Sequence, residues 1–184
     1  MEASARPRIR AGALVVLALV ALVVLSVDQV SKFLVVSNLR PYEEVEVFGA
    51  LLKFDYVRNS GAAFSIGSGY TWVFSIVGLA VLVFIVWFAR RIRSMGWAVL
   101  FGLLLGGLLG NLTDRLTRAP GFGMGEVVDF LKIPVLPAIF NLADVAIVTS
   151  MALFLVLTLT GRGLDGRRAR LGMPAHAAET PHDS

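Results

Sequence analysis

Six polar residues near the ends of apolar segments are the first candidates for chemistry in this chain. They are three aspartates, two asparagines and one arginine: Asp114, Asp129, Asp144, Asn111, Asn141 and Arg115. Ionisable side chains are costly to place near hydrocarbon, so where they occur there they mark a functional site by default. Any single one could be a snorkelling side chain or half of an internal salt bridge. We expect the whole set, crowded around two helix ends, to form a site.

A pair of these carboxylates could hydrolyse a peptide bond. Two carboxyl groups in one poorly solvated cleft do not both ionise easily, so one keeps a proton and the pair supplies a general base and a general acid at neutral pH. Peptide hydrolysis by an activated water needs these two groups. The sequence offers no competing arrangement: its two histidines, His176 and His182, lie in the polar tail, and it has no cysteine and no H-E-x-x-H motif. A catalytic zinc is therefore not expected.

The spacing of these residues places several of them on common helix faces. Arg115 follows Asn111 by four positions. Asp144 follows Asn141 by three positions, so in a helix the members of each pair share a face. Asp129 lies in an apolar stretch that could be a short re-entrant or interfacial strand, which is tolerated at membrane depth only where it lines a protein cavity.

Asp28 and Lys32 are also four positions apart and share one face of the first apolar segment. They are either an interfacial ion pair that ends a span or groups that brace or line a site at that membrane surface. The sequence leaves both possibilities open.

The composition predicts an integral membrane protein. The chain has 184 residues, of which 57% are hydrophobic and only 16% are charged, and several runs approach the length of about 20 apolar residues that a helix needs to cross a bilayer. The expected spans are residues 11–36, 70–89, 95–112 and 138–160, within a single membrane domain over 11–160. In the third span, Gly102, Gly106 and Gly110 recur every four residues, a spacing that lets two helices approach closely in lipid.

A small β-sheet is expected between the first two spans. In residues 38–69 apolar positions alternate in part with charged ones, and residues 48–50 offer a turn, which favours a β-hairpin. A second tight turn is expected at residues 59–61. The predicted fold class is therefore an α-helical integral membrane protein with four transmembrane helices and a small extracytoplasmic β-sheet and loop subdomain.

The arginines predict the orientation of the chain. Ten of the seventeen Lys and Arg residues lie in the basic N-terminus (1–10), in residues 90–93 and in the polar tail (161–184). With four spans these segments fall on one side, which the positive-inside rule makes cytoplasmic, and the sheet, the 113–137 loop and the polar ends of the spans then face outward together. The net charge of +4 is explained by this topology and by anionic lipid better than by nucleic acid. We expect the tail to be disordered beyond its first turn.

Five short motifs occur in order along the chain. They are DQVSK (28–32), RNSGAAFS (58–65), GNLTDR (110–115), VVDF (127–130) and FNLAD (140–144). Together on a four-span chain they resemble the motifs of lipoprotein signal peptidase, also called signal peptidase II. The resemblance covers roughly residues 12–160 and leaves out the two tails.

The resemblance implies an aspartyl endopeptidase of the bacterial inner membrane. Members of that family remove signal peptides from diacylglyceryl-modified prolipoproteins, cutting on the N-terminal side of the lipidated cysteine, and they are the target of the cyclic peptide globomycin. The catalytic pair would be Asp129 and Asp144. The positions that match binding and supporting residues of the family are Asp28, Lys32, Asn59, Gly61, Asn111, Arg115 and Asn141. We expect prolipoproteins and membrane lipids as partners, a monomer, and no cofactor, metal or nucleic acid.

Asp114 needs a separate decision. By spacing alone it could replace Asp129 in a catalytic pair. In the family pattern the aspartate of the NLTDR motif is not catalytic, so we assign Asp114 a supporting role, either paired with a nearby arginine or capping the helix end.

Two other functions would also use acids near a membrane. A small ion- or proton-coupled transporter is the main alternative, but the sequence has no internal repeat and its polar residues gather at one face instead of the midplane. A non-enzymatic assembly protein could use the acids in helix–helix salt bridges, but it would need more basic partners in the spans than Lys32 and Arg115. The peptidase is the favoured function.

Overall fold

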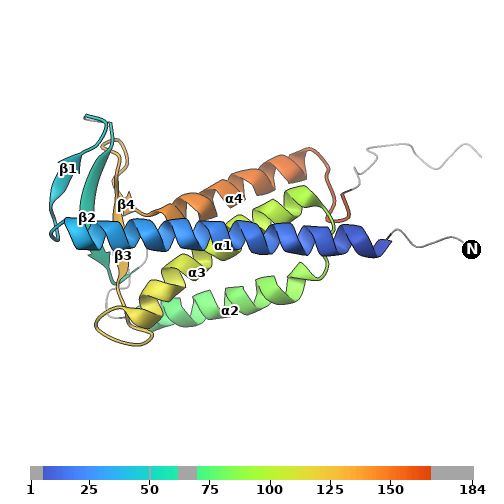
Figure 1. Cartoon of the computed structure of the whole chain (residues 1–184), viewed down its shortest axis with the longest axis horizontal. Helices are drawn as coiled ribbons and strands as arrows, with labels where there is room; N and C mark the ends of the chain where they lie inside the picture. The colour runs from blue at the N-terminus through green and yellow to red at the C-terminus, as the bar shows by residue number, and fades with distance from the viewer. Residues whose placement is uncertain (1–5, 50, 62–69, 167–184) are drawn as a thin grey trace, which may run out of the picture.

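Four long helices form a bundle that carries a small β-sheet at one end (Figure 1). The computed structural model describes residues 6–49, 51–61 and 70–166. The elements in chain order are α1 (Arg6–Asn38), β1 (Glu44–Glu46), β2 (Lys53–Asn59), α2 (Thr71–Ala89), α3 (Met95–Thr117), β3 (Val127–Lys132), β4 (Ile139–Phe140) and α4 (Leu142–Leu159). Each of the four helices is long and apolar enough to cross a membrane. The predicted fold class, a four-helix membrane protein with a small sheet, is confirmed.

We call the end of the bundle that carries the strands the sheet end, and the opposite end, where α2 turns into α3, the loop end (Figure 1). The described N-terminal end of α1 also lies at the loop end (Figure 1). The segment that follows α4 lies there too, because the carbonyl oxygen of Leu164 accepts hydrogen bonds from the backbone N–H groups of Arg93 and Ser94, each at 3.0 Å. The expected disorder of the tail concerns residues that lie mostly outside the described part of the chain.

Helix α3 packs closely against two neighbours because glycines leave room for their backbones. A Cβ on Gly102 would lie 2.7 Å from a side-chain carbon of α1, and one on Gly106 would lie 2.6 Å from the Cβ of Val24. The glycine repeat therefore brings α1 and α3 together, as its spacing predicted. On another side of α3, a Cβ on Gly107 would lie 2.5 Å from the carbonyl oxygen of Ala143, so α4 approaches equally closely.

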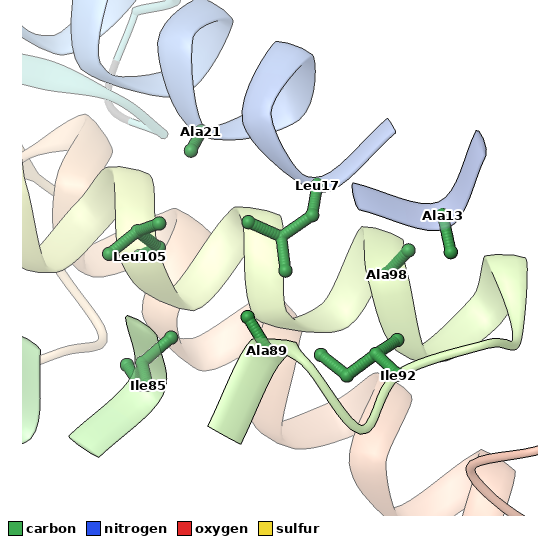
Figure 2. Close-up of a cluster of buried hydrophobic side chains, with 8 residues drawn as sticks. All are labelled: Ala13, Leu17, Ala21, Ile85, Ala89, Ile92, Ala98 and Leu105. Atoms are coloured by element: carbon green, nitrogen blue, oxygen red, sulfur yellow. The ribbon is translucent and has the colours of Figure 1, made fainter. Parts of the chain in front are cut away.

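The half of the bundle toward the loop end has an apolar core (Figure 2). Small and branched side chains from α1, α2, α3 and the α2–α3 turn fill it: Ala13, Leu17, Ala21, Ile85, Ala89, Ile92, Ala98 and Leu105. The polar residues predicted to carry chemistry lie toward the sheet end. The fold thus separates a packed apolar half from a polar half.

The sheet is larger than the hairpin that the sequence predicted. Strands β1 and β2 form the expected antiparallel hairpin within residues 38–69. Strands β3 and β4 come from the segment between α3 and α4 and extend the sheet in the order β1-β2-β3-β4, with every neighbouring pair antiparallel. In this register Val57 lies opposite Asp129 and Asn59 lies opposite Val127. The sheet therefore brings the C-terminal part of β2 beside the strand that carries Asp129.

Three helix ends differ from the expected spans by four or five residues. Helix α1 begins at Arg6 instead of residue 11. Helix α3 continues to Thr117 instead of ending at residue 112, so Asn111 and Arg115 lie within the helix. Its polar residues find partners on neighbouring elements, which lets the helix continue beyond the apolar run. Helix α4 begins at Leu142 instead of residue 138, because Asn141 caps it and the two preceding residues form β4.

Candidate active site

Asp129 is held on β3 by two amide side chains. The Nδ2 group of Asn59 donates a 2.9 Å hydrogen bond to Asp129 Oδ2, and that of Asn141 donates a 2.7 Å bond to Oδ1. Asn59 is itself held by a turn, since its Oδ1 accepts the N–H of Gly61 at 3.0 Å. Asp129 is only 4% exposed. Both carboxylate oxygens are therefore fixed from two different elements.

Asp144 lies in the first turn of α4 and takes part in a capping box. The side-chain oxygen of Asn141 accepts the N–H of Asp144 at 3.0 Å, and Asp144 Oδ2 accepts the N–H of Asn141 at 3.1 Å. This reciprocal pair satisfies two of the free N–H groups at a helix start. The other oxygen, Oδ1, accepts a 2.8 Å bond from Nδ2 of Asn111 on α3. Asp144 is thus oriented by its own helix start and by α3.

Asn141 links the two aspartates. Besides Asp129 and the N–H of Asp144, its side chain bonds Asn111, whose Oδ1 accepts from Nδ2 of Asn141 at 3.1 Å. One fully buried asparagine therefore contacts both carboxylate-bearing residues. The expectation that Asn141 and Asp144 point together from the start of the fourth span is met, although through a helix cap instead of a shared helix face.

Both carboxylates line one cavity of about 410 Å³. Its polar end is formed by the two aspartates with Asn59, Gly61, Asn111 and Arg115. Its walls are apolar and come from α2, α3 and β4, with Phe74, Val77, Val81, Leu108, Ile139 and Phe140. The cavity can therefore accommodate an apolar peptide segment with its backbone beside the two acids.

Arg115 brings a cation to the same cavity. Its Nη2 donates a 2.7 Å hydrogen bond to the carbonyl oxygen of Gly61, and its guanidinium lies 5.2 Å from the ring centroid of Phe74. Its Nη1 is buried and has no hydrogen-bond partner among the described residues. A buried donor without a partner is unfavourable, so Nη1 is available to a carbonyl group of a ligand in the cavity.

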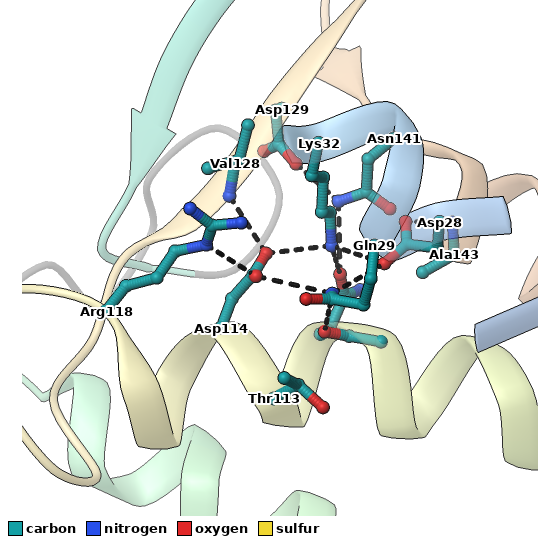
Figure 3. A network of polar contacts seen from close by, with 12 residues as sticks. Asp28, Gln29, Lys32, Thr113, Asp114, Arg118, Val128, Asp129, Asn141 and Ala143 are labelled. Carbon is teal, nitrogen blue, oxygen red and sulfur yellow. Dashed lines mark hydrogen bonds and ion pairs between the residues drawn. The ribbon is translucent and has the colours of Figure 1, made fainter. Parts of the chain in front are cut away.

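Asp28 and Lys32 support this site from α1 (Figure 3). Lys32 Nζ lies 2.9 Å from Asp28 Oδ2 and 2.8 Å from Asp114 Oδ2, and it donates a 3.0 Å bond to Asn111 Oδ1. Asp28 Oδ1 accepts the N–H of Ala143, at the start of α4, at 2.9 Å. Lys32, Asp28 and Asp114 are all fully buried. Of the two possibilities that the sequence left open, the structure therefore shows groups that brace the site.

Asp114 lies outside the cavity lining and connects three elements. Besides Lys32, its carboxylate binds Arg118 Nε at 2.6 Å and accepts the backbone N–H of Val128 on β3 at 3.2 Å. The expected pairing with a nearby arginine is present. Since Val128 precedes Asp129, this contact helps to hold the strand that carries the buried carboxylate. The geometry supports a positioning role and gives Asp114 no access to the cavity.

Burial changes the proton affinity of Asp129. Loss of solvent, with a smaller contribution from the nearby charge of Asp144, raises the pKa of Asp129 from 3.8 to about 7, although hydrogen bonds from Asn59 and Asn141 oppose the shift. A carboxyl group with such a pKa can hold or release a proton at neutral pH. Within the described residues neither Asp129 nor Asp144 forms an ion pair with a basic side chain, and no group of three or more His, Cys, Asp or Glu residues could hold a metal ion.

Two residues of the support network were not predicted from the sequence. Gln29 donates from Nε2 to the carbonyl oxygen of Gly110 at 3.1 Å and to Asp28 Oδ2 at 3.1 Å. Arg118 binds Asp114 from the side opposite Lys32 (Figure 3). Arg118 follows Asp114 by four positions, a spacing that could have indicated the pair. Gln29 offers no comparable local signal.

Comparisons with known proteins agree with this geometry. Residues 20–160 match the family described as signal peptidase (SPase) II. The chain is 66% identical over 171 residues to a lipoprotein signal peptidase of Leifsonia xyli subsp. xyli, which covers 92% of this chain and 79% of that protein. It is 48% identical over 151 residues to a lipoprotein signal peptidase of Streptomyces coelicolor, which covers 82% of this chain and 74% of that protein.

A solved structure described as a bacterial membrane enzyme has the same fold, with a TM-score of 0.69 and 31% sequence identity over 77% of this chain and 85% of that one. The family match over residues 20–160 contains the second part of α1, the other three helices, both aspartates and the residues that hold them. The match favours a protease over the transporter that the sequence left as an alternative. The chain therefore belongs to the signal peptidase II family, the lipoprotein signal peptidases.

Proposed function

We propose that this protein is an aspartyl endopeptidase that removes signal peptides from diacylglyceryl-modified prolipoproteins, and that Asp129 and Asp144 are its catalytic pair. The observation that carries the proposal is that both carboxylates, linked through Asn141, line one apolar-walled cavity of about 410 Å³. Membership of the signal peptidase II family supports the substrate class. The cut is on the N-terminal side of the lipidated cysteine.

The proposed chemistry divides the work between the two acids. Asp129, with a pKa of about 7, carries the shared proton and donates it toward the scissile carbonyl oxygen. Asp144 takes a proton from water as the water oxygen forms a bond to the carbonyl carbon. The tetrahedral intermediate then collapses. The C–N bond breaks as the amine of the lipidated cysteine takes the proton that Asp144 holds, and Asp129 recovers its proton from a hydroxyl group of the intermediate. The signal peptide leaves as a carboxylic acid that ionises in water.

Polar groups around the pair would position the substrate backbone. Nη1 of Arg115 has no partner among the described residues and lies in the cavity lining, so it can donate to a substrate carbonyl. Asn111 and Asn59 line the same end of the cavity. Preorganised donors of this kind are effective because they need no rearrangement as charge develops.

The acyl chains of the substrate would lie against α4. A separate apolar groove of about 340 Å³ shares Phe140 and Asp144 with the catalytic cavity and is otherwise lined by Leu136, Val145, Val148 and Thr149. The diacylglyceryl group is attached to the residue next to the scissile bond, so its chains must leave the site within a short distance of the aspartates. The groove offers an apolar exit from the site toward the surrounding lipid.

The proposed orientation puts the sheet end outside the cell and both termini in the cytoplasm. It rests on the basic residues at the loop end, where residues 90–93 lie beside the segment that follows α4 and where the described start of α1 also lies (Figure 1). The positive-inside rule places such a cluster in the cytoplasm. The active site then lies near the outer membrane surface, where a lipidated signal segment can enter laterally.

The test is cleavage of a diacylglyceryl-modified prolipoprotein by the purified protein in micelles. Asp129→Asn and Asp144→Asn should each lower the rate by about 10²–10⁴-fold, the usual share of general acid–base catalysis. Asp114→Asn should keep more activity, since Asp114 does not line the cavity. Asp55→Asn is a matched control, because Asp55 is a buried aspartate of β2 that binds Lys132 outside the site. Full activity of Asp129→Asn or of Asp144→Asn would contradict the assignment of these two residues as the catalytic pair.

A further inference from the structure

A second cavity lies behind the sheet, on the face opposite the two aspartates. Side chains alternate between the faces of a strand, so Arg58, which pairs with Val128, points away from the face that carries Asn59 and Asp129. The cavity has a volume of about 240 Å³ and is lined by Tyr56, Arg58, Arg118, Ala119, Glu126 and Val128. It shares no lining residue with the catalytic cavity. We call it the arginine cavity.

Two guanidinium groups reach the arginine cavity with donors still available. Nε of Arg58 donates to the hydroxyl oxygen of Tyr56 at 3.0 Å, and Nε of Arg118 donates to Asp114 Oδ1 at 2.6 Å. Over residues 6–49, 51–61 and 70–166, these are the hydrogen bonds that the two side chains make. Within this described part of the chain the N–H groups on their terminal nitrogens have no acceptor, so they are available to a ligand. A planar guanidinium fork matches the oxygen atoms of a phosphate group.

The charge of the lining matches a ligand with one negative charge. Two arginines and Glu126 give the arginine cavity a formal charge of +1. A phosphodiester carries a single negative charge, whereas a phosphomonoester carries nearly two at neutral pH. Glu126 can also accept a hydrogen bond from a hydroxyl group of the alcohol attached to the phosphate. The volume suits a headgroup and leaves the acyl chains outside.

The arginine cavity lies where the spans end. Helix α3 ends at Thr117, immediately before Arg118. The loop that follows is tied to the first turns of α2, because Ser75 Oγ donates a 2.6 Å hydrogen bond to the carbonyl oxygen of Gly123. The same loop carries Phe122 and Met124, which are 84% and 46% exposed. Exposed apolar side chains beside arginines at the end of a span are typical of the headgroup region of a bilayer.

We propose that the arginine cavity binds the phosphodiester headgroup of a membrane phospholipid between Arg58 and Arg118. The bound headgroup also supports the active site. Arg118 binds Asp114, and Asp114 accepts the N–H of Val128, the residue before Asp129. A phosphate that immobilises Arg118 therefore stabilises the contact that holds β3. The arginine cavity shares no lining residue with the cavity that contains the two aspartates, so headgroup binding can be tested without measuring cleavage.

The binding test uses the purified full-length protein in micelles, titrated with dioctanoyl phosphatidylglycerol and read by native mass spectrometry. Loss of one charge-assisted contact in Arg58→Gln should weaken the tightest bound lipid by about tenfold. Arg40→Gln is the matched control, because Arg40 is exposed and lies before β1, outside the arginine cavity. It should leave the affinity unchanged. Equal losses in both variants would indicate a diffuse charge effect and would overturn the proposal.

A competition experiment distinguishes a lipid from a free anion. Glycerophosphoglycerol and inorganic phosphate carry the same phosphate chemistry without acyl chains. At concentrations equal to that of the lipid they should displace little of it. If either one displaces the lipid fully under these conditions, the cavity is a soluble-anion site and the lipid assignment is wrong.

Hydrogen exchange tests the link to β3. Phosphatidylglycerol should slow exchange of a peptide that covers residues 127–132 in the wild type and in Arg40→Gln, but not in Arg58→Gln. Arg58 is exposed, so its variant is expected to fold, and thermal unfolding checks this. Equal exchange with and without lipid in the wild type would overturn the proposed support of the active site.

Discussion

Asn141 donates a 2.7 Å hydrogen bond to Asp129 Oδ1, so the residue that caps the start of α4 holds a carboxylate on β3. The same side chain accepts the N–H of Asp144 at 3.0 Å. The relative placement of the two acids is therefore set by one neutral amide and not by an ion pair. A neutral link leaves both carboxyl groups free to exchange a proton.

The two roles of Asn141 can be separated by replacing it with serine. A serine hydroxyl can still accept the N–H of Asp144 as an N-cap, but it is too short to reach Asp129 or the side chain of Asn111, which the amide also contacts. We expect the free energy of unfolding of Asn141→Ser to lie within about 1 kcal/mol of the wild-type value. We expect the variant to cleave about 10–100-fold more slowly, because it loses a hydrogen bond to a charged group. Cleavage kinetics and thermal unfolding measure the two effects.

Asn141→Ala is the comparison, because it removes the cap as well and should cost about 1 kcal/mol more stability than serine. A serine variant that cleaves at the wild-type rate would show that the link to Asp129 is not needed.

The pKa of Asp129 predicts the pH dependence of cleavage. If Asp129 must be protonated, kcat/KM should fall about tenfold per pH unit above the pKa of about 7. The donor Asn59 lowers this pKa, so Asn59→Ala should move the alkaline limb to higher pH. Asn38→Ala removes an exposed asparagine of α1 that bonds the carbonyl oxygen of Leu34 and should leave the limb in place. A flat profile between pH 6 and 9 would contradict the acid role.

The same pKa predicts how stability changes with pH. The unfolded carboxyl group has a pKa near 3.8 and the folded one near 7, so between these values the folded state binds more protons and stability falls as pH rises. The penalty reaches its full size above pH 7 and is as much as about 4 kcal/mol. Asp129→Asn removes it. The variant should therefore unfold at a higher temperature than the wild type at pH 8, with a difference that vanishes near pH 4. A difference independent of pH would contradict the shift.

Local sequence signals predicted much of this structure. Apolar runs of helical length located the four helices, and alternation around a turn located the β1–β2 hairpin. Helix-face spacing predicted that Asn111 and Arg115 share one surface, and both line the cavity that contains Asp129 and Asp144. These features depend on residues that are close in sequence, which is why pattern alone could find them.

The rest of the site depends on contacts between distant segments. The pairing of Val57 with Asp129 joins β2 and β3, which are separated in the sequence by both α2 and α3. Strand β4 has too few residues to show any alternation. The cap at Asn141 was a local signal that the apolar pattern concealed, because an Asn three residues before an Asp inside an apolar run resembles a helix face. The extended α3 was missed for a related reason, since its last turn is polar but has buried partners.

Lys32 is expected to be essential for folding. It is fully buried and compensates the charges of Asp28 and Asp114. Lys32→Met would leave the buried carboxylate of Asp28 without its cation and Asp114 with Arg118 alone, and breaking a buried pair in this way costs about 3–5 kcal/mol. Lys53→Met is the control, because Lys53 pairs with exposed glutamates at the sheet surface, where pairs contribute about 0–1 kcal/mol. Yield and thermal unfolding compare the two. Similar stabilities would show that Asp28 and Asp114 tolerate the loss.

Gly110 is expected to couple helix packing to the active site. A Cβ at this position would lie 2.5 Å from Asp28 Oδ2 and 3.2 Å from the Cβ of Ala143. Asp28 holds the N–H of Ala143, one residue before Asp144. A methyl group would therefore displace Asp28 and shift the start of α4. Overpacking of this kind costs about 1–3 kcal/mol, and we expect Gly110→Ala to lose cleavage activity beyond what its lower stability explains.

Two other glycines separate the effects of crowding and of the active site. Gly102→Ala crowds α1 at 2.7 Å in the apolar half of the bundle, so it should lower stability while its folded fraction keeps its activity. In Gly121→Ala the added Cβ meets no atom within 4 Å, so this variant should change neither stability nor activity. The quantity to compare is the activity per folded molecule, which is obtained from cleavage rates measured well below each melting temperature. If Gly102→Ala and Gly110→Ala lose this activity equally, crowding alone accounts for the defect, and the contact between Gly110 and Asp28 has no special effect on Asp129 and Asp144.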